Sequence, residues 1–280
     1  MTFGSRFHAA VAARGPLCAG IDPHAALLHA WGLPDSVEGL ESFALTATEA
    51  LAAECAVVKP QSAFYERFGS RGVAVLERVI AVAREAGALV LLDVKRGDVG
   101  STSEAYAEAY LDPASPIAAD AITVSPFLGF GSLDPFVDAA RKHDAGLFVL
   151  ARTSNKEAPE VQAAHVDDGR TVTATMLDHL RHLNAGADPL GSFGAVVGAT
   201  IGDTGEDFAF NGPILAPGYG AQGGTTAELP RIFGAALPNV LPSSSRELLR
   251  VGPSAPAMRE AARRTNDELR TLLSRTAGQR

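Results

Sequence analysis

The sequence has few cysteines, no excess of positive charge and no long apolar run. Its 280 residues contain two cysteines, Cys18 and Cys55, which form no disulfide framework and indicate a reducing compartment. Its net charge of −8 argues against a general nucleic-acid binder. No apolar run approaches the roughly 20 residues that span a bilayer, and Arg6, His8 and Arg14 interrupt the N-terminal stretch that a secretory signal would need. We therefore expect a cytoplasmic protein that binds neither membranes nor nucleic acids.

Several catalytic and metal-binding motifs are also missing. The sequence contains no C-x-x-C, no H-E-x-x-H and no G-x-S-x-G, so zinc and serine-hydrolase chemistry lack support. His179 and His182 lie three residues apart in a predicted helix, but no third ligand accompanies them. We expect these two histidines to lie on a solvated helix face.

A regular alternation of short apolar runs and longer helical patterns is present instead. The strand-like runs are Leu17–Asp22, Ala56–Pro60, Leu89–Lys95, Ala121–Ser125, Gly146–Ala151, Gly194–Ala199, Pro213–Ala216 and Asn239–Pro242. The clearest helical patterns are Glu41–Glu54, Val73–Glu85, Leu133–Arg141, Thr171–Leu183 and Ala257–Leu273. Continuous apolar strands are typical of parallel sheets that are buried on both faces. Eight such units predict an α/β fold, a (β/α)8 TIM barrel forming a single domain over residues 1–280 with a frayed tail after about residue 274. An open doubly wound sheet is the alternative.

The densest group of charged residues ends the third predicted strand. Side chains two residues apart in a strand share a face, so Asp93 and Lys95 point the same way and Val94 points toward the helices. Asp98 follows three residues later. Carboxylates beside a lysine keep its ammonium charged and fix its proton, as a general acid requires. A structural ion-pair network is the alternative interpretation.

Other polar side chains stand at comparable strand ends. Asp22 ends the first predicted strand, Lys59 ends the second, and Ser154 follows the fifth. In a barrel these ends meet at one mouth, which would bring Asp22 and Lys59 next to Asp93 and Lys95. Such an array could hold sugar hydroxyls and a reacting carboxylate, and Ser154 could bond a planar ligand. Each residue alone could equally be a loop cap or a solvated strand end.

A glycine-rich segment follows the seventh predicted strand. Gly218, Gly220 and Gly223 satisfy G-x-G-x-x-G, but no acidic residue ends the next strand where a dinucleotide ribose would need one. The segment more plausibly offers backbone N–H groups to a single phosphate. Arg246, after the eighth strand, could grip the same phosphate through two hydrogen bonds. A glycine-rich turn beside a surface arginine is the alternative.

The Asp-x-Lys-x-x-Asp pattern on a third barrel strand resembles the orotidine 5′-phosphate decarboxylase family. The segment 93–107, DVKRGDVGSTSEAYA, is similar to the longer bacterial branch of that family. Further matches follow in order along the chain: GIDP at 20–23, VKPQSAF at 58–64, TVSPFLG at 123–129, VGAT at 197–200 and PGYGAQG at 217–223. One departure is Ser125, where that branch would have asparagine, which affects the expected bonding of the local loop.

The resemblance implies conversion of orotidine 5′-monophosphate to uridine 5′-monophosphate and carbon dioxide, the last step of de novo pyrimidine synthesis. It implies no metal and no organic cofactor. It also implies a homodimer with shared active sites at the subunit interface. Lys95 would protonate carbon 6 of the pyrimidine, Asp93 would face the substrate carboxylate, and Asp98 would reach into the partner's site. Lys59 would bind a ribose hydroxyl and join the charged array.

The resemblance also assigns substrate-binding residues. Asp22 would bind ribose hydroxyls, Thr102 would reach into the partner's site with Asp98, and Ser154 would bond the pyrimidine edge. Gln222 and Arg246 would hold the phosphate.

Two other functions remain possible from the sequence. Sugar-phosphate decarboxylases and aldolase-like synthases share the Asp-x-Lys-x-x-Asp array but use magnesium, for which the sequence offers no clear additional acidic ligand. A non-catalytic phosphate-ligand sensor on the same fold would have no need of the charged Lys95 array.

Overall fold

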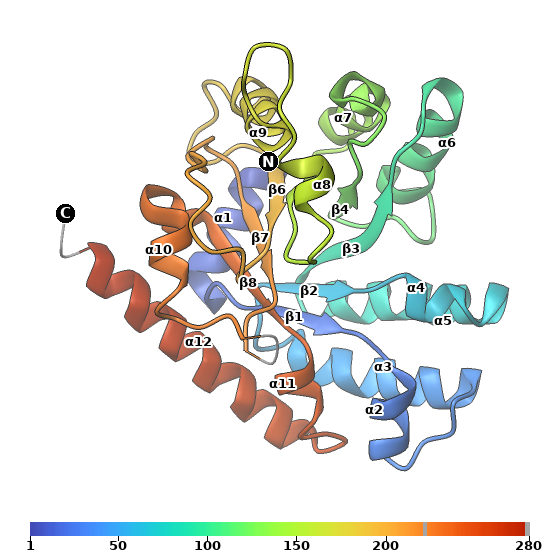
Figure 1. Cartoon of the computed structure of the whole chain (residues 1–280). Coiled ribbons are helices and arrows are strands. Elements are labelled where there is room, and N and C mark those ends of the chain that lie inside the picture. The colour runs from blue at the N-terminus through green and yellow to red at the C-terminus, as the bar shows by residue number, and fades with distance from the viewer. Residues whose placement is uncertain (221–222, 278–280) are drawn as a thin grey trace.

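Eight parallel strands close into a barrel in chain order, as Figure 1 shows. The computed structural model describes residues 1–220 and 223–277. The strands are β1 (Cys18–Ile21), β2 (Val57–Pro60), β3 (Leu89–Arg96), β4 (Ala121–Val124), β5 (Gly146–Arg152), β6 (Phe193–Val197), β7 (Ile214–Pro217) and β8 (Val240–Ser244). Pairing of β1 with β8 closes the ring. The predicted TIM barrel is confirmed, and an open doubly wound sheet is excluded.

Helices surround the barrel. The α-helices are α1 (Phe3–Arg14), α2 (Ala25–Ala30), α3 (Val37–Leu51), α4 (Ala63–Glu66), α5 (Gly69–Glu85), α6 (Gly100–Leu111), α7 (Asp134–Lys142), α8 (Pro159–Gln162), α9 (Val172–Leu183), α10 (Leu229–Phe233), α11 (Arg246–Leu249) and α12 (Ala255–Ala277). Two 3-10 helices are η1 (Phe130–Leu133) and η2 (Gly234–Asn239). Helix α12 runs three residues past the predicted start of the frayed tail. Among the described helices, none is long and apolar enough to cross a membrane.

The interior of the barrel is apolar at its amino-terminal end. Helix α1 lies there and places Phe3 and Phe7 in a buried cluster with inward-facing strand residues such as Phe148. A Cβ atom at Gly146 would lie 2.4 Å from the Phe3 ring, so a residue without a side chain is needed at that point. Because helix α1 closes this end, a ligand can enter the barrel from the carboxyl-terminal end of the strands.

Side chains alternate along each strand between the barrel interior and the helical layer. On β3, Leu91 belongs to the interior cluster and Val94 belongs to the cluster between strands and helices, as predicted. The inner position that follows Leu91 is Asp93. The same step on β2 leads from Val57 to Lys59, and on β8 from Leu241 to Ser243. These three strands therefore change from apolar to polar on their inner face as they approach the open end.

Candidate active site

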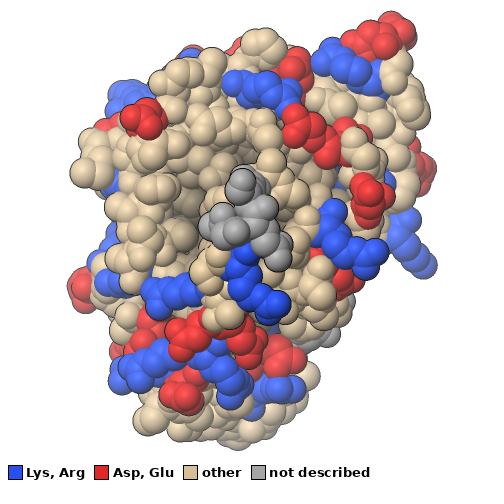
Figure 2. Space-filling model, turned by 90° about the vertical axis from the view of Figure 1, so that its left-hand side faces the viewer, with Lys and Arg blue, Asp and Glu red and all other residues tan. Residues whose placement is uncertain are grey.

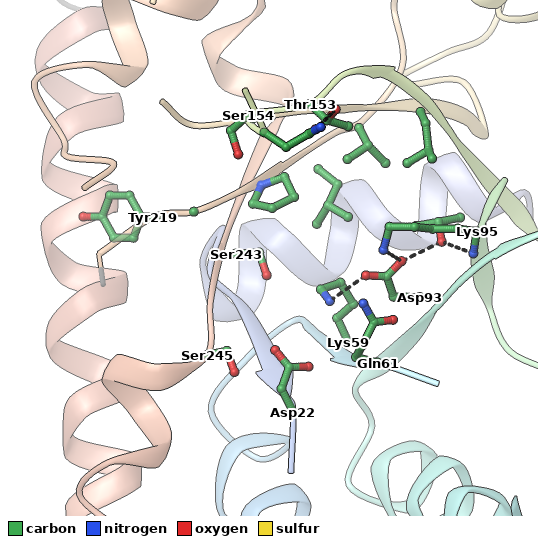
Figure 3. A pocket seen from close by; sticks show the side chains of 18 of the residues that line it. Asp22, Lys59, Gln61, Asp93, Lys95, Thr153, Ser154, Tyr219, Ser243 and Ser245 are labelled. Atoms are coloured by element: carbon green, nitrogen blue, oxygen red, sulfur yellow. Dashed lines mark hydrogen bonds and ion pairs between the residues drawn. The ribbon is translucent and has the colours of Figure 1, made fainter. Parts of the chain in front are cut away.

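A cavity of about 360 Å³ opens at the carboxyl-terminal end of the barrel. Strands β2 to β8 contribute to its lining, and Asp22, which directly follows β1, completes the ring. Figure 3 shows the side chains of Lys59, Asp93 and Lys95 gathered on one side of it, with Asp22 pointing toward Lys59. The predicted site residues that line the cavity are Asp22, Lys59, Asp93, Lys95, Ser154 and Arg246. The barrel thus brings together side chains that are up to 224 residues apart in the sequence, from position 22 to position 246.

Asp93 is the centre of the charged group. Its Oδ2 accepts a hydrogen bond from Lys59 Nζ at 3.1 Å, and its Oδ1 accepts one from Lys95 Nζ at 2.7 Å. Thr123 Oγ1 donates a third hydrogen bond to Oδ1 at 2.8 Å. The arrangement within the chain is therefore one carboxylate between two ammonium groups, and not the two carboxylates around one lysine that the sequence suggested.

The charges in this group stabilise one another. Burial by itself would raise the pKa of Asp93, but Lys59, Lys95 and the Thr123 hydrogen bond outweigh burial and hold that pKa below its usual value. Burial would lower the pKa of Lys59, yet the carboxylates of Asp93 and Asp22 keep it above its usual value. At neutral pH the pair is therefore ionised. The Lys95 side chain is 45% exposed, so its ammonium faces the cavity.

Asp22 and Ser245 lie side by side just after the ends of the neighbouring strands β1 and β8. A Cβ atom at Gly20 would be 3.1 Å from Asp22 Oδ2 and 3.2 Å from Ser245 Oγ, so this glycine makes room for both side chains. Asp22 Oδ1 and Ser245 Oγ are buried and have no hydrogen-bond partner within the described part of the chain. Buried oxygens of this kind normally have a partner. A ligand with hydroxyl groups would supply it.

His24 lies at the rim beside Asp22. Its ring packs against Phe64 with centroids 4.2 Å apart. Burial lowers the pKa of His24, and Arg246 and Arg67 lower it further while Asp22 opposes them. The imidazole is therefore neutral at pH 7 and can donate or accept a hydrogen bond at the rim.

Arg246 begins helix α11 and lines the cavity. Its guanidinium makes no ion pair or hydrogen bond with any residue that the structure describes, which leaves it available for an anion. The nearby glycine-rich segment is folded onto itself: the N–H groups of Gly220, Gly223 and Gly224 donate to carbonyls within the segment. In this conformation these three groups do not face a ligand, contrary to the expectation of an open phosphate cradle. Gln222 lies outside the described residues.

Ser154 lies two residues after the end of β5 and lines the cavity. A Cβ atom at Gly198 would be 2.8 Å from the Ser154 Cβ, so the glycine at the end of β6 allows this close approach. The Ser154 hydroxyl therefore faces the cavity from the wall opposite Asp22.

Asp98 and Thr102 do not line this cavity. The Asp98 carboxylate accepts a hydrogen bond from the Val99 N–H at 2.8 Å, and Thr102 lies exposed on α6. Within one chain, Asp98 therefore does not reach the mouth where Asp93 and Lys95 lie. The reason is local, because the chain turns away from the barrel after Lys95.

The sequence analysis did not assign several lining residues. They are Gln61, Phe64, Thr123, Thr153, Ser243 and Ser245. Gln61 lies two residues after Lys59, and Thr123 two after Ala121, so the same two-residue period would have identified both. Ser125, the departure from the family pattern, keeps its loop in place through its backbone N–H, which donates to Arg96 O at 2.8 Å.

No group of three His, Cys, Asp or Glu side chains that could hold a metal ion is found among the described residues. His182 is 77% exposed, and His179 stacks on Phe130 with centroids 4.4 Å apart.

Figure 2 shows one face of the molecule, where the surface is hollowed beside the residues in grey and Lys and Arg are interspersed with Asp and Glu.

Comparison with known proteins identifies the family. The sequence model of the orotidine 5′-phosphate decarboxylase / HUMPS family matches residues 15–247. An orotidine 5′-phosphate decarboxylase from a Nocardioides species is 72% identical over 272 residues, covering 96% of this chain and 99% of the relative. Another from Streptomyces coelicolor is 62% identical over 273 residues, covering 97% and 98%.

The fold agrees with these relationships. The crystal structure of a Streptomyces avermitilis protein assigned as an orotidine 5′-phosphate decarboxylase matches with a TM-score of 0.96 and 60% identity, over 98% of this chain and 96% of that one. The chain belongs to the orotidine 5′-phosphate decarboxylase family.

Proposed function

We propose that the chain converts orotidine 5′-monophosphate to uridine 5′-monophosphate and carbon dioxide, with Lys95 as the proton donor. The observation that supports this most directly is the array of buried Lys59, buried Asp93 and cavity-facing Lys95 at the mouth of a barrel of this family. The geometry suits a reaction that creates and then protonates a carbanion. No metal or organic cofactor takes part in the proposed reaction.

The chemistry follows from the charges. Breaking the bond between carbon 6 and the carboxylate leaves an electron pair on carbon 6 and releases carbon dioxide. The Lys95 ammonium, fixed by Asp93, stabilises the developing negative charge and donates a proton to carbon 6. The neutral amine then regains a proton from water. Asp93 faces the substrate carboxylate, and their repulsion is relieved when carbon dioxide leaves.

Binding groups hold the remainder of the substrate. We assign Asp22 and Lys59 to the ribose hydroxyls. One of these hydroxyls would donate a hydrogen bond to Asp22 Oδ1, which has no partner in the described part of the chain. Ser154 would bond the pyrimidine edge, and Arg246, together with Gln222, would hold the phosphate. Phosphate binding would rearrange the glycine-rich segment over the ligand, so remote binding energy contributes to excluding water.

A homodimer with shared sites would place Asp98 and Thr102 in the partner's cavity. Three exposed apolar residues lie near them: Val99 is 56% exposed, Phe127 is 76% exposed and Leu128 is 53% exposed. The loops that carry these residues meet, because a Cβ atom at Gly97 would be 2.3 Å from the Ser125 carbonyl oxygen. Grouped apolar side chains of this kind favour a protein interface.

The first test is the fall in pyrimidine absorbance when orotidine 5′-monophosphate is added in the presence of EDTA. We expect turnover in EDTA, loss of turnover by orders of magnitude in Lys95→Ala, and full turnover in Lys142→Ala, which removes an exposed lysine of α7. Absence of turnover by the folded wild-type chain would contradict the proposal. Activity on sugar phosphates that requires magnesium would favour the synthase alternative, and nucleotide binding without turnover would favour the sensor.

Mixing two inactive variants tests the shared sites. Lys95→Ala and Asp98→Ala subunits, when mixed and allowed to exchange, should form heterodimers in which one of the two sites is intact. We therefore expect up to about a quarter of wild-type activity in an equimolar mixture, since half of the dimers would be mixed and half of their sites intact. A mixture that stays inactive although heterodimers form would show that Asp98 acts in its own subunit.

The proposed location is the cytoplasm.

A further inference from the structure

The hydroxyl of Thr123 joins the backbone of β3 to the Asp93 carboxylate. Its Oγ1 accepts hydrogen bonds from the N–H of Val94 at 3.0 Å and of Lys95 at 2.9 Å. It donates its own proton to Asp93 Oδ1 at 2.8 Å. A hydroxyl has one proton and two lone pairs, so these three bonds use its full capacity. Thr123 is 1% exposed, and its hydroxyl has nothing left to offer a substrate.

These bonds occur where the pairing of β3 with β4 is interrupted. Leu92 pairs with Ile122, and Arg96 pairs with Val124, so three residues of β3 lie opposite Thr123 alone. The regular ladder cannot supply an acceptor for every N–H group in such an irregularity. Buried N–H groups require a partner, and the Thr123 side chain provides it here.

The irregularity gives Lys95 an unusual backbone conformation. Its φ angle is 47°, in the left-handed region that residues other than glycine seldom adopt. In this conformation its Nζ lies 2.7 Å from Asp93 Oδ1, while the side chain remains 45% exposed toward the cavity. Such conformations persist where neighbouring groups hold them. The hydrogen bond from the Lys95 N–H to Thr123 is a direct restraint of this kind.

We propose that Thr123 is the positioning residue that sets the Lys95 ammonium and the Asp93 carboxylate relative to each other. This inference rests on the proposed function and deepens it, because it names what orients the proton donor. Thr123 acts through its neighbours and is not a catalytic residue. The same hydroxyl fixes the backbone of Lys95 and one oxygen of Asp93, so its loss displaces both partners together.

The test compares Thr123→Val, which keeps the shape and removes the hydroxyl, with Thr123→Ser, which keeps the hydroxyl. We expect kcat to fall about 100-fold in Thr123→Val, the loss typical of a reacting group displaced by about 1 Å. Affinity for uridine 5′-monophosphate, measured by calorimetry, should change far less, since the ribose and phosphate groups are untouched. Thr123→Ser should recover most of kcat. Thr48→Val is the matched control, because Thr48 is buried in α3 and its hydroxyl donates to Ala44 O, far from the cavity.

Each outcome decides the matter. Equal kcat for Thr123→Val and the wild type would overturn the role of Thr123, as would a folded Thr123→Ser variant that recovers no turnover. If Thr123→Val does not fold, Thr123→Cys takes its place, since a thiol is a weak donor and acceptor, and full turnover of that variant would equally overturn the role. Failure of the wild-type chain to act on orotidine 5′-monophosphate would instead overturn the proposed function, so the two failures are distinguishable.

Discussion

Replacing Lys59 by methionine should destabilise the protein by about 3 kcal/mol at pH 7. Two unit charges 3.1 Å apart attract by about 5 kcal/mol at an effective dielectric constant of about 20. Desolvation offsets part of this, but removing one partner of a buried pair leaves the other uncompensated and typically costs about 3–5 kcal/mol. Asp93 keeps Lys95 and Thr123 as partners, so we expect the lower end of that range.

The assay is urea unfolding of four proteins: the wild type, Lys59→Met, Asp93→Asn and the double variant. Trp31 is the only tryptophan, is 8% exposed and packs on Phe43, so its fluorescence will report loss of the fold. Coincident circular dichroism transitions would justify two-state free energies. Because Asp93→Asn removes the charge that Lys59 neutralises, the double variant should be more stable than the sum of the single changes by about 2 kcal/mol.

The pH dependence has a definite sign. The folded pKa of Asp93 is depressed, so its contribution is present above the unfolded value of about 3.9 and is lost as the pH falls through the folded value. In Lys59→Met that depression is smaller. The stability difference from the wild type should therefore stay constant above about pH 5 and shrink as the pH falls below about 4, where Asp93 of the variant takes up its proton before Asp93 of the wild type. A coupling below about 0.5 kcal/mol, or a difference independent of pH, would refute the electrostatic explanation.

Two further predictions concern the scaffold and the interface. Asn184 is 1% exposed; its amide nitrogen donates to Phe193 O at 2.8 Å and to Phe210 O at 3.3 Å, and its amide oxygen accepts from the Phe193 N–H at 3.2 Å. Asn184→Ala should therefore lower the free energy of unfolding in urea by about 3 kcal/mol, and a loss below about 1 kcal/mol would contradict this role. Phe127→Asp should shift sedimentation toward monomer while Val251→Asp, at an exposed site after α11, should not; equal dimerisation of both variants would place the interface elsewhere.

The strands were predictable because the environment of a parallel barrel strand is uniform. Each is buried on both faces, so each appears as a continuous apolar run, and the observed bounds lie within two residues of most predicted ones. Helix α6 was missed because its buried face, built from Ser103, Ala107, Tyr110 and Leu111, includes only one large aliphatic residue and so shows no apolar stripe. Helix α1 was missed because two large apolar residues, Phe3 and Phe7, carry its packing. These helices depend on tertiary contacts that no local pattern encodes.

The site was predictable up to the point where the backbone becomes irregular. The two-residue period correctly placed Asp93 inside and Val94 outside. It does not extend to Asp98, because the left-handed conformation of Lys95 and the irregular pairing opposite Thr123 redirect the chain. A pattern rule assumes regular geometry, and it therefore fails first where function has distorted the strand.

The cavity is positively charged within an acidic protein. Lys59, Lys95 and Arg246 give three positive charges in its lining and Asp22 and Asp93 two negative ones, a net charge of +1 in a chain of −8. A dianionic phosphate and a carboxylate on one ligand would be attracted to this lining, and the excess of cations is uncompensated while no anion is bound. An apolar lining of equal volume would stabilise the barrel more. The charges are therefore best explained by an anionic ligand that the cavity binds. The same residues that reduce the stability of the fold determine the chemistry of the cavity.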